Sequence, residues 1–187
     1  KIDFELLSRE FAHTRRKNLL LRDLDELVNQ QLSKMMFANP QRIDYYDRYQ
    51  EIIDAYNAEQ NRATIEKTFM DLMELASSLD TEQQRYVREG FSSDEELSVY
   101  DLLFLENLTK QEIETIKKVS VDLLTKIKQQ IAKLDHWTDK QETKAIVDNL
   151  IRNTLWQELP NSYDVSDIQT YQKKIYEYVY MRYPEVA

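Results

Sequence analysis

The chain has 187 residues with one glycine, three prolines and no cysteine. So few glycines disfavour antiparallel sheets, whose hairpin turns need glycine, and glycine-rich phosphate-binding loops. Without cysteine the chain can form no disulfide and no cysteine-ligated metal site. The formal net charge of -9 opposes general attraction to nucleic-acid phosphates or anionic membranes, although a local basic patch remains compatible with it. We therefore expect an all-α chain without a sheet, long enough to bury a core of its own.

Neither the start of the chain nor its apolar runs mark it for a membrane. KIDFELLSRE lacks the pattern of a signal peptide, and no apolar run approaches the roughly 20 residues that a membrane-spanning helix needs. We expect a soluble, cytoplasmic chain that makes no membrane contact. Because it begins with Lys1 instead of methionine, we also expect a piece of a longer protein.

Apolar residues at three- and four-residue steps predict three helices in the first half, over residues 18–37, 43–56 and 62–79. The pair Asn39-Pro40 ends the first of them, because the residue before a proline is pushed out of the helical region. Asp80 then starts a short helix that ends near Gly90, since glycine tolerates the positive φ of a helix end.

Two capping boxes mark the starts of the next helices, Ser93 with Glu96 and Thr109 with Glu112. The second opens the longest periodic run, which predicts a central helix over residues 109–134. Two further helices, over residues 139–159 and 166–183, close the chain.

The expected architecture is a compact bundle of roughly seven or eight helices. No repeat or flexible linker divides the chain, so we expect one compact unit. Within it, two lobes can meet near residue 60, an N-terminal helical lobe over residues 1–60 and a C-terminal helical lobe over residues 61–187.

The stretch DHWTDKQETK, residues 135–144, contains a carboxylate-lysine string of the kind found in nucleases, with Asp135 or Asp139 followed by Glu142 and Lys144. A nuclease site holds such residues on adjacent strands, where they clamp a metal against the phosphate. This string instead lies between two helical patterns, so we interpret Thr138 or Asp139 as the cap of the next helix.

Two other residues of this stretch, His136 and Trp137, are interpreted as a corner that packs on the core. The alternatives for them are a metal ligand and a stacking platform.

Glu10 and His13 form one Glu-x-x-His unit, whereas a di-iron bundle site uses two such units on facing helices. Residue 133, three before His136, is lysine, so the second histidine lacks the required glutamate. We find no glycine-flanked serine for hydrolysis either. The residues give no catalytic set, and we expect no catalytic, cofactor-binding or metal site.

Residues 13–18, HTRRKN, are the one dense basic run, and their functional reading is contact with a DNA backbone or an acidic partner through Arg15, Arg16 and Lys17. The alternative is a solvated helix start. Farther on, an acidic interval over residues 74–106 precedes a lysine-rich helix face over residues 110–133. These two can pair internally, or the acidic one can attract a basic partner.

The tyrosines of the ending KKIYEYVYMRYP cannot all share one helix face. We expect an aromatic core helix, part of which can meet another protein.

Several strings of helical residues follow one another over most of the chain, in a fixed order: KNLLLRDLDELVNQQLSKMMFANPQRIDYYDRYQEIIDAYN, RATIEKTFMDLMELASSLDTEQQRYVREGF, ELSVYDLLF, LDHWTDKQETKAIVDNLIRNTLWQELP and KKIYEYVYMRYP. Together they resemble the C-terminal helical region of the R (restriction and translocation) subunit of type I restriction-modification enzymes. The stretch NSYDVSDIQ and the first dozen residues match least.

The resemblance implies a parent subunit with a metal-dependent nuclease domain and two motor domains that use ATP and Mg²⁺ to move DNA. It also implies partners, namely the modification and specificity subunits of the same enzyme, the subunit's own motor domains, and DNA through the complex. None of the family's catalytic residues maps to a position of this chain.

Three hypotheses follow for the function. The first is a non-catalytic module that holds the R subunit on the methyltransferase core. The second is a brace beside the motor, where Arg15, Arg16 and Lys17 contact the DNA backbone. The third is an independent helical metal protein, and the only candidate ligands for it in the sequence are Glu10 and His13.

Overall fold

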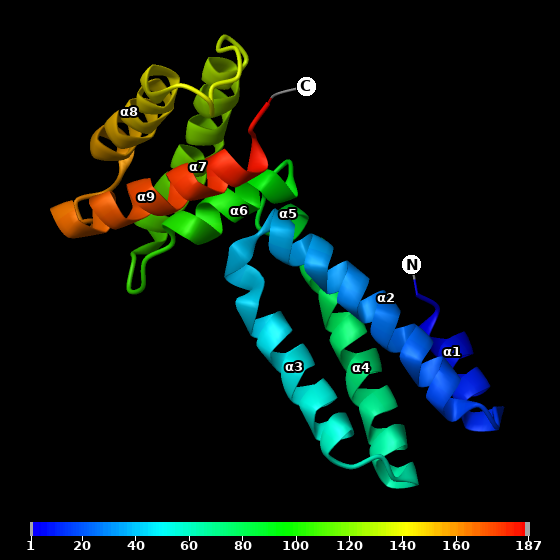
Figure 1. Cartoon of the computed structure of the whole chain (residues 1–187). Coiled ribbons are helices and arrows are strands. Elements are labelled where there is room, and N and C mark those ends of the chain that lie inside the picture. The colour runs from blue at the N-terminus through cyan, green and yellow to red at the C-terminus, as the bar shows by residue number, and fades with distance from the viewer. Residues whose placement is uncertain (1, 186–187) are drawn as a thin grey trace. The chain divides into compact units, whose positions relative to one another are not determined.

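The computed structural model describes residues 2–185, and all the regular structure in them is helical. The all-α prediction is confirmed, because these residues form helices joined by turns and contain no strand (Figure 1). The elements are α1 (Phe4–His13), α2 (Lys17–Ala38), η1 (Pro40–Arg42, a 3₁₀ turn), α3 (Ile43–Ala58), α4 (Arg62–Gln83), α5 (Arg85–Arg88), α6 (Asp94–Leu103), α7 (Lys110–Ile131), α8 (Gln141–Glu158) and α9 (Val165–Arg182).

The chain divides into two compact units, one up to Arg85 and one from Tyr86 onward. This boundary differs from the position near residue 60 that the sequence suggested, because α4 packs against both α2 and α3 and so belongs to unit 1. The expected helix break at Asp80 is wrong. Residues 80–83 continue α4, and the Thr81 hydroxyl donates to the Ser77 carbonyl (3.0 Å) within the helix.

Unit 1 is built around α4, whose buried side chains contact α1 and α2 on one side and α3 on another. The rings of Phe11 and Phe69 stack with centroids 3.7 Å apart, which fastens α1 onto α4. A buried ion pair joins Arg42 to Glu82 at 3.1 Å, and Arg85 bonds to the same carboxylate at 3.0 Å. An aromatic stack and a charge cluster therefore tie α4 to the preceding helices.

Unit 2 is organised around α7, which packs between α6 and α8, while α9 packs against α6 and α8. The long helix predicted over residues 109–134 is α7, and it has 22 residues, as do α2 and α4. Its fully buried apolar side chains repeat at helical spacing, as the sequence pattern indicated: Ile116, Leu123 and Ile127.

The helix starts of unit 2 confirm some predicted caps and add one that was missed. Thr109 and Glu112 form the predicted capping box, with backbone-to-side-chain bonds of 3.2 and 2.8 Å. Ser93 caps α6, but the reciprocal bond to its partner glutamate comes from the Ser92 amide (2.7 Å). α9 opens on an unpredicted box between Asp164 and Asp167. Gly90 has φ +85° and lies just past α5, as expected for a helix terminator.

The stretch DHWTDKQETK forms the corner between α7 and α8, and its predicted cap at Thr138 or Asp139 is wrong. α8 begins at Gln141 with Lys140 in the cap position and no side-chain cap bond. The Thr143 hydroxyl donates instead to the carbonyl of Trp137 at 2.7 Å, which holds the corner against the first turn of the helix.

Trp137 is fully buried, which confirms that it packs on the core, and its indole Nε1 donates to the Tyr183 carbonyl at 2.6 Å. Its neighbour His136 is exposed with φ +46° and pairs with the exposed carboxylate of Asp135. Only the tryptophan of this corner therefore belongs to the core, where it links the α7–α8 corner to the end of α9.

Replacing Trp137 with phenylalanine removes the indole donor and leaves the buried Tyr183 carbonyl unpaired. We expect a loss of about 1–3 kcal/mol in the free energy of unfolding, measured by urea denaturation. The matched control is Trp156→Phe, because Trp156 is 49% exposed and its replacement should change stability by less than about 0.5 kcal/mol. Equal losses in the two variants would contradict the role given to Trp137.

Candidate functional site

The carboxylate-lysine string of residues 135–144 does not assemble into a metal clamp. Asp135 is almost fully exposed, and Asp139 lies in the turn before α8, whose first turn contains Glu142. Within residues 2–185, no group of three or more His, Asp or Glu side chains is placed to hold a metal ion. Glu10 and His13 both project from the exposed surface of α1.

Among residues 2–185, none of the helices has the length and apolar character that a membrane-spanning segment needs.

The basic run lies at the corner between α1 and α2, and its three cations have different surroundings. Lys17 is held in place, since its Nζ contacts the Glu66 carboxylate at 2.9 Å and lies 4.8 Å from the centroid of the Phe11 ring. Glu66 also pairs with Arg62 at 3.2 Å. The hydrogen bonds from Lys17 and then Arg62 hold the pKa of the Glu66 carboxyl below its ordinary value.

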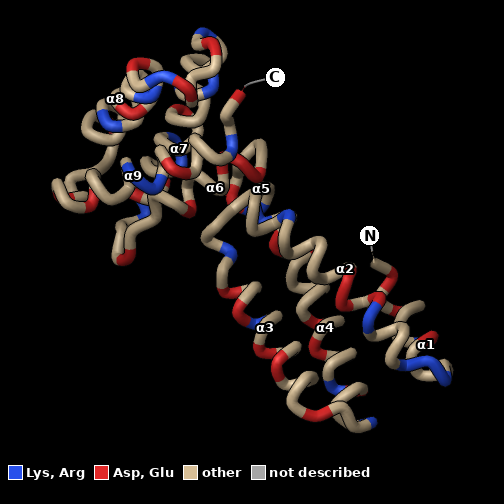
Figure 2. The backbone as a smooth tube through the Cα atoms, viewed as in Figure 1, with Lys and Arg blue, Asp and Glu red and all other residues tan. Residues whose placement is uncertain are grey.

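Arg15 and Arg16 are exposed, and within the described part of the chain neither forms an ion pair. Figure 2 shows Lys and Arg positions in blue at the turn between α1 and α2. Arg16 occupies the cap position of α2 without a side-chain cap bond, and its amide donates to the Thr14 hydroxyl at 3.0 Å. The fold brings Arg62 to the same corner through Glu66, a neighbour that the sequence did not reveal. We call Arg15, Arg16, Lys17 and Arg62 the basic corner.

Charged side chains of unit 2 pair with one another, and two carboxylates of the acidic interval over residues 74–106 take part in these pairs. Lys117 contacts Glu89 at 3.2 Å, and Lys128 pairs with Glu95. Lys126 contacts Asp122 at 2.5 Å, and this bond is the main cause that raises the pKa of the lysine. Several lysines of α7 are thus engaged with carboxylates of their own unit.

The tyrosines of the C-terminal helix α9 and its end divide into buried and exposed ones, as their positions around the helix indicated. Tyr178 and Tyr183 are buried, and their rings meet edge to face with centroids 6.2 Å apart. Tyr180 is 38% exposed, and its ring meets the Trp137 ring edge to face with centroids 5.7 Å apart. Met181 beside it is 68% exposed. One face of α9 is therefore core and another is surface.

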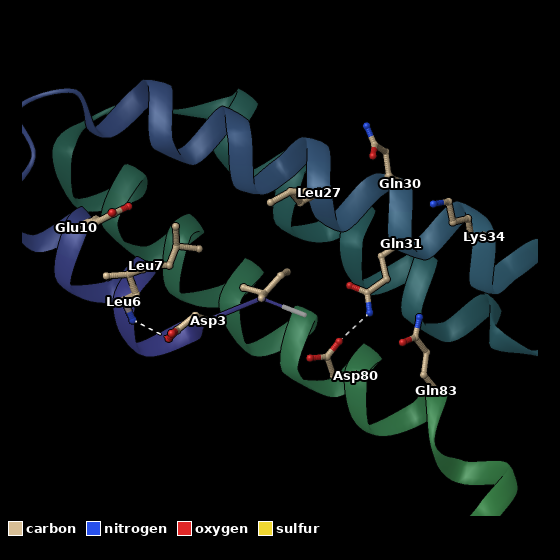
Figure 3. Close-up of a pocket in the computed structure, with 11 residues that line it drawn as sticks. Asp3, Leu6, Leu7, Glu10, Leu27, Gln30, Gln31, Lys34, Asp80 and Gln83 are labelled. Carbon is tan, nitrogen blue, oxygen red and sulfur yellow. Dashed lines mark hydrogen bonds between the residues drawn. The ribbon is translucent and has the colours of Figure 1, made fainter.

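A groove of about 590 Å³ opens in unit 1 between α1, α2 and α4 (Figure 3). Leucines from two helices line it, Leu6 on α1 with 54% of its surface exposed and Leu27 on α2 with 49% exposed. We call it the α1–α2–α4 groove. Its other lining residues are Ile2, Asp3, Leu7, Glu10, Gln30, Gln31, Lys34, Asp80 and Gln83.

Asp80 is the most unusual residue of this groove. One carboxylate oxygen accepts a hydrogen bond from the Gln31 side-chain amide at 3.1 Å, drawn as a dashed line in Figure 3. The other oxygen is buried and has no hydrogen-bond partner among residues 2–185. Such an oxygen has lost its water without gaining a donor, which is energetically unfavourable.

A second groove, of about 460 Å³, lies between α2, α3 and α4, with Leu21 and Leu72 among its buried lining. The Tyr49 hydroxyl donates to the Asp25 carboxylate at 2.7 Å and so joins α3 to α2 beside this groove. Burial and then this bond to the carboxylate raise the pKa of Tyr49. Because Arg22 and Asp25 both line it, the second groove shows no preference for either charge.

Comparison with known families gives one match that spans nearly the whole chain. The family model described as "Type I restriction enzyme HindI endonuclease subunit-like, C-terminal" matches residues 1–183. No curated protein and no solved structure matches the chain.

Proposed function

We propose that this chain is a non-catalytic helical module that holds its subunit on the methyltransferase core. The starting point is its family, because the chain belongs to the C-terminal regions of HindI-like type I restriction endonuclease subunits. Its partners on this proposal are the modification and specificity subunits and the motor domains of its own subunit. ATP and Mg²⁺ then act in other domains of the parent, and the complex works in the cytoplasm.

The observation that carries the proposal is the α1–α2–α4 groove. Leu6 and Leu27 are large apolar side chains about half exposed in one concave place, and apolar surface of this kind is a common mark of protein interaction sites. The residues that the structure describes contain no acidic or histidine cluster with the geometry of a metal site. A recognition surface is therefore better supported than a reaction centre.

A direct test is co-elution of this chain with the assembled modification and specificity subunits in size-exclusion chromatography with light scattering, with and without duplex DNA. We expect a complex in the absence of DNA, because the groove offers apolar surface for a protein partner. Removal of the module from the complete R subunit should then weaken assembly of the enzyme. Assembly that survives this deletion would contradict the proposal.

A second candidate function is contact with the DNA backbone, and the basic corner favours it. Arg15 and Arg16 are exposed and free of ion pairs within residues 2–185, so neither has to leave a carboxylate in order to bind a phosphate. Lys17 is already committed to Glu66 and would contribute less. This brace would act beside the motor domains of the parent.

The variant Arg15→Gln/Arg16→Gln tests this second function. If both arginines contact phosphates, the slope of log affinity against log salt concentration should flatten by roughly 2, since each contact contributes about 0.9. The control is Lys173→Gln/Lys174→Gln on α9, which removes the same charge from unit 2. Affinity is measured by fluorescence anisotropy with labelled duplex DNA. Equal slopes for the wild-type chain and the arginine variant would rule out the brace.

A further inference from the structure

The α1–α2–α4 groove combines three features that together specify the chemistry of a partner. The first is apolar, because Leu6 and Leu27 come from different helices and are both about half exposed at the groove. A partner that covers them gains the free energy of removing apolar surface from water. Figure 3 shows Leu6 and Leu7 on α1 and Leu27 on α2, so both helices contribute to the apolar part of the groove.

The second feature is the sign of the charge around the leucines. Asp3, Glu10 and Asp80 are acidic, and Lys34 is the single cation among the described residues that line the groove. Asp3 also caps α1 by accepting from the Leu6 amide at 3.0 Å, so its carboxylate is fixed at the groove. The surplus of carboxylates attracts a basic partner and repels an acidic one.

The third feature is the unpaired carboxylate oxygen of Asp80. Gln31 occupies one oxygen, and the buried second oxygen lacks a donor within residues 2–185. The terminal torsion of an aspartate is broad, so a small rotation can turn this oxygen toward an incoming donor. A lysine or arginine of a partner would supply that donor, and hydrogen bonds between charged groups are among the stronger ones.

We propose that the α1–α2–α4 groove binds a short amphipathic helix of a partner protein, whose apolar side chains cover Leu6 and Leu27 and whose lysine or arginine pairs with Asp80. This inference rests on the proposed docking function and names the surface and the partner chemistry. The lining of α2 runs from Leu27 to Lys34, which is about 10 Å of helix, so two turns of a partner helix match its length.

Two other features near the groove affect which partner it can bind, namely Lys34 and the second groove. Lys34 is a cation of the groove itself, and its charge opposes the binding of a basic partner. The second groove, next to α3, has Arg22 and Asp25 on its lining and does not select a basic helix. The experiment therefore changes residues of both grooves.

The probe is a labelled helical peptide of about 15 residues, long enough to form a helix, with leucines on one face and lysines on the other. Its affinity for the whole chain is measured by fluorescence anisotropy. We expect Asp80→Asn and Leu27→Gln each to weaken binding roughly tenfold or more, since each removes one of the two proposed contacts. The variant Lys34→Gln should leave binding unchanged or strengthen it.

Matched controls separate the groove from general charge and hydrophobicity. Asp54→Asn removes the same charge from the exposed surface of α3, and Leu19→Gln removes an exposed leucine of α2 that lines the second groove. Neither should change affinity by more than twofold. A peptide with glutamates in place of the lysines should not bind. Equal binding by the wild-type chain and Asp80→Asn, or losses of the same size in the controls, would overturn the proposal.

The same variants distinguish this inference from the docking function on which it rests. If the wild-type chain binds the methyltransferase core and Asp80→Asn and Leu27→Gln bind it equally well, docking stands and the groove is the wrong surface. If the wild-type chain does not bind the core, the docking function fails, and the peptide measurement still decides whether the groove takes a basic amphipathic helix.

Discussion

The packing of α4 constrains most of unit 1. The buried residues of this helix span about half of its circumference at 100° per residue, more than one neighbouring helix covers, so α1 and α2 pack on one side and α3 on another. Phe69 and Leu79 are almost completely buried as a result. The α1–α2–α4 groove and the second groove both lie beside α4, where the helices packed on it leave apolar side chains uncovered.

Most of the longer helices could be read from the sequence, because they have regular apolar stripes and several have capping residues. The sequence pattern did not predict α1, which has one buried residue. Thr109 and Glu112 form the capping box that their spacing predicts. Thr138 and Asp139 do not cap α8, since the chain uses these residues for a turn that places the buried Trp137 against α9 and its end. That contact spans 46 residues, so tertiary packing overrode a valid local capping signal.

The candidate surfaces were less accessible to sequence reasoning. Arg15 and Arg16 stand out because they are adjacent in a basic run, but the approach of Arg62 depends on the packing of α2 against α4. Leu6 and Leu27 look like core residues in any helical pattern, and only the fold shows that both remain about half exposed at one groove. The unpaired oxygen of Asp80 likewise appears only once α2 places Gln31 beside it.

The central claim is that this module docks its subunit through unit 1, and hydrogen exchange on the complete R subunit tests it most directly. Backbone amides of α1 and of residues 27–34 should exchange more slowly when the modification and specificity subunits are added, because a bound helix covers the groove. Amides of α8, whose exposed face lies in unit 2, serve as the internal reference. Unchanged exchange in α1 and residues 27–34, with slower exchange confined to unit 2, would contradict the account.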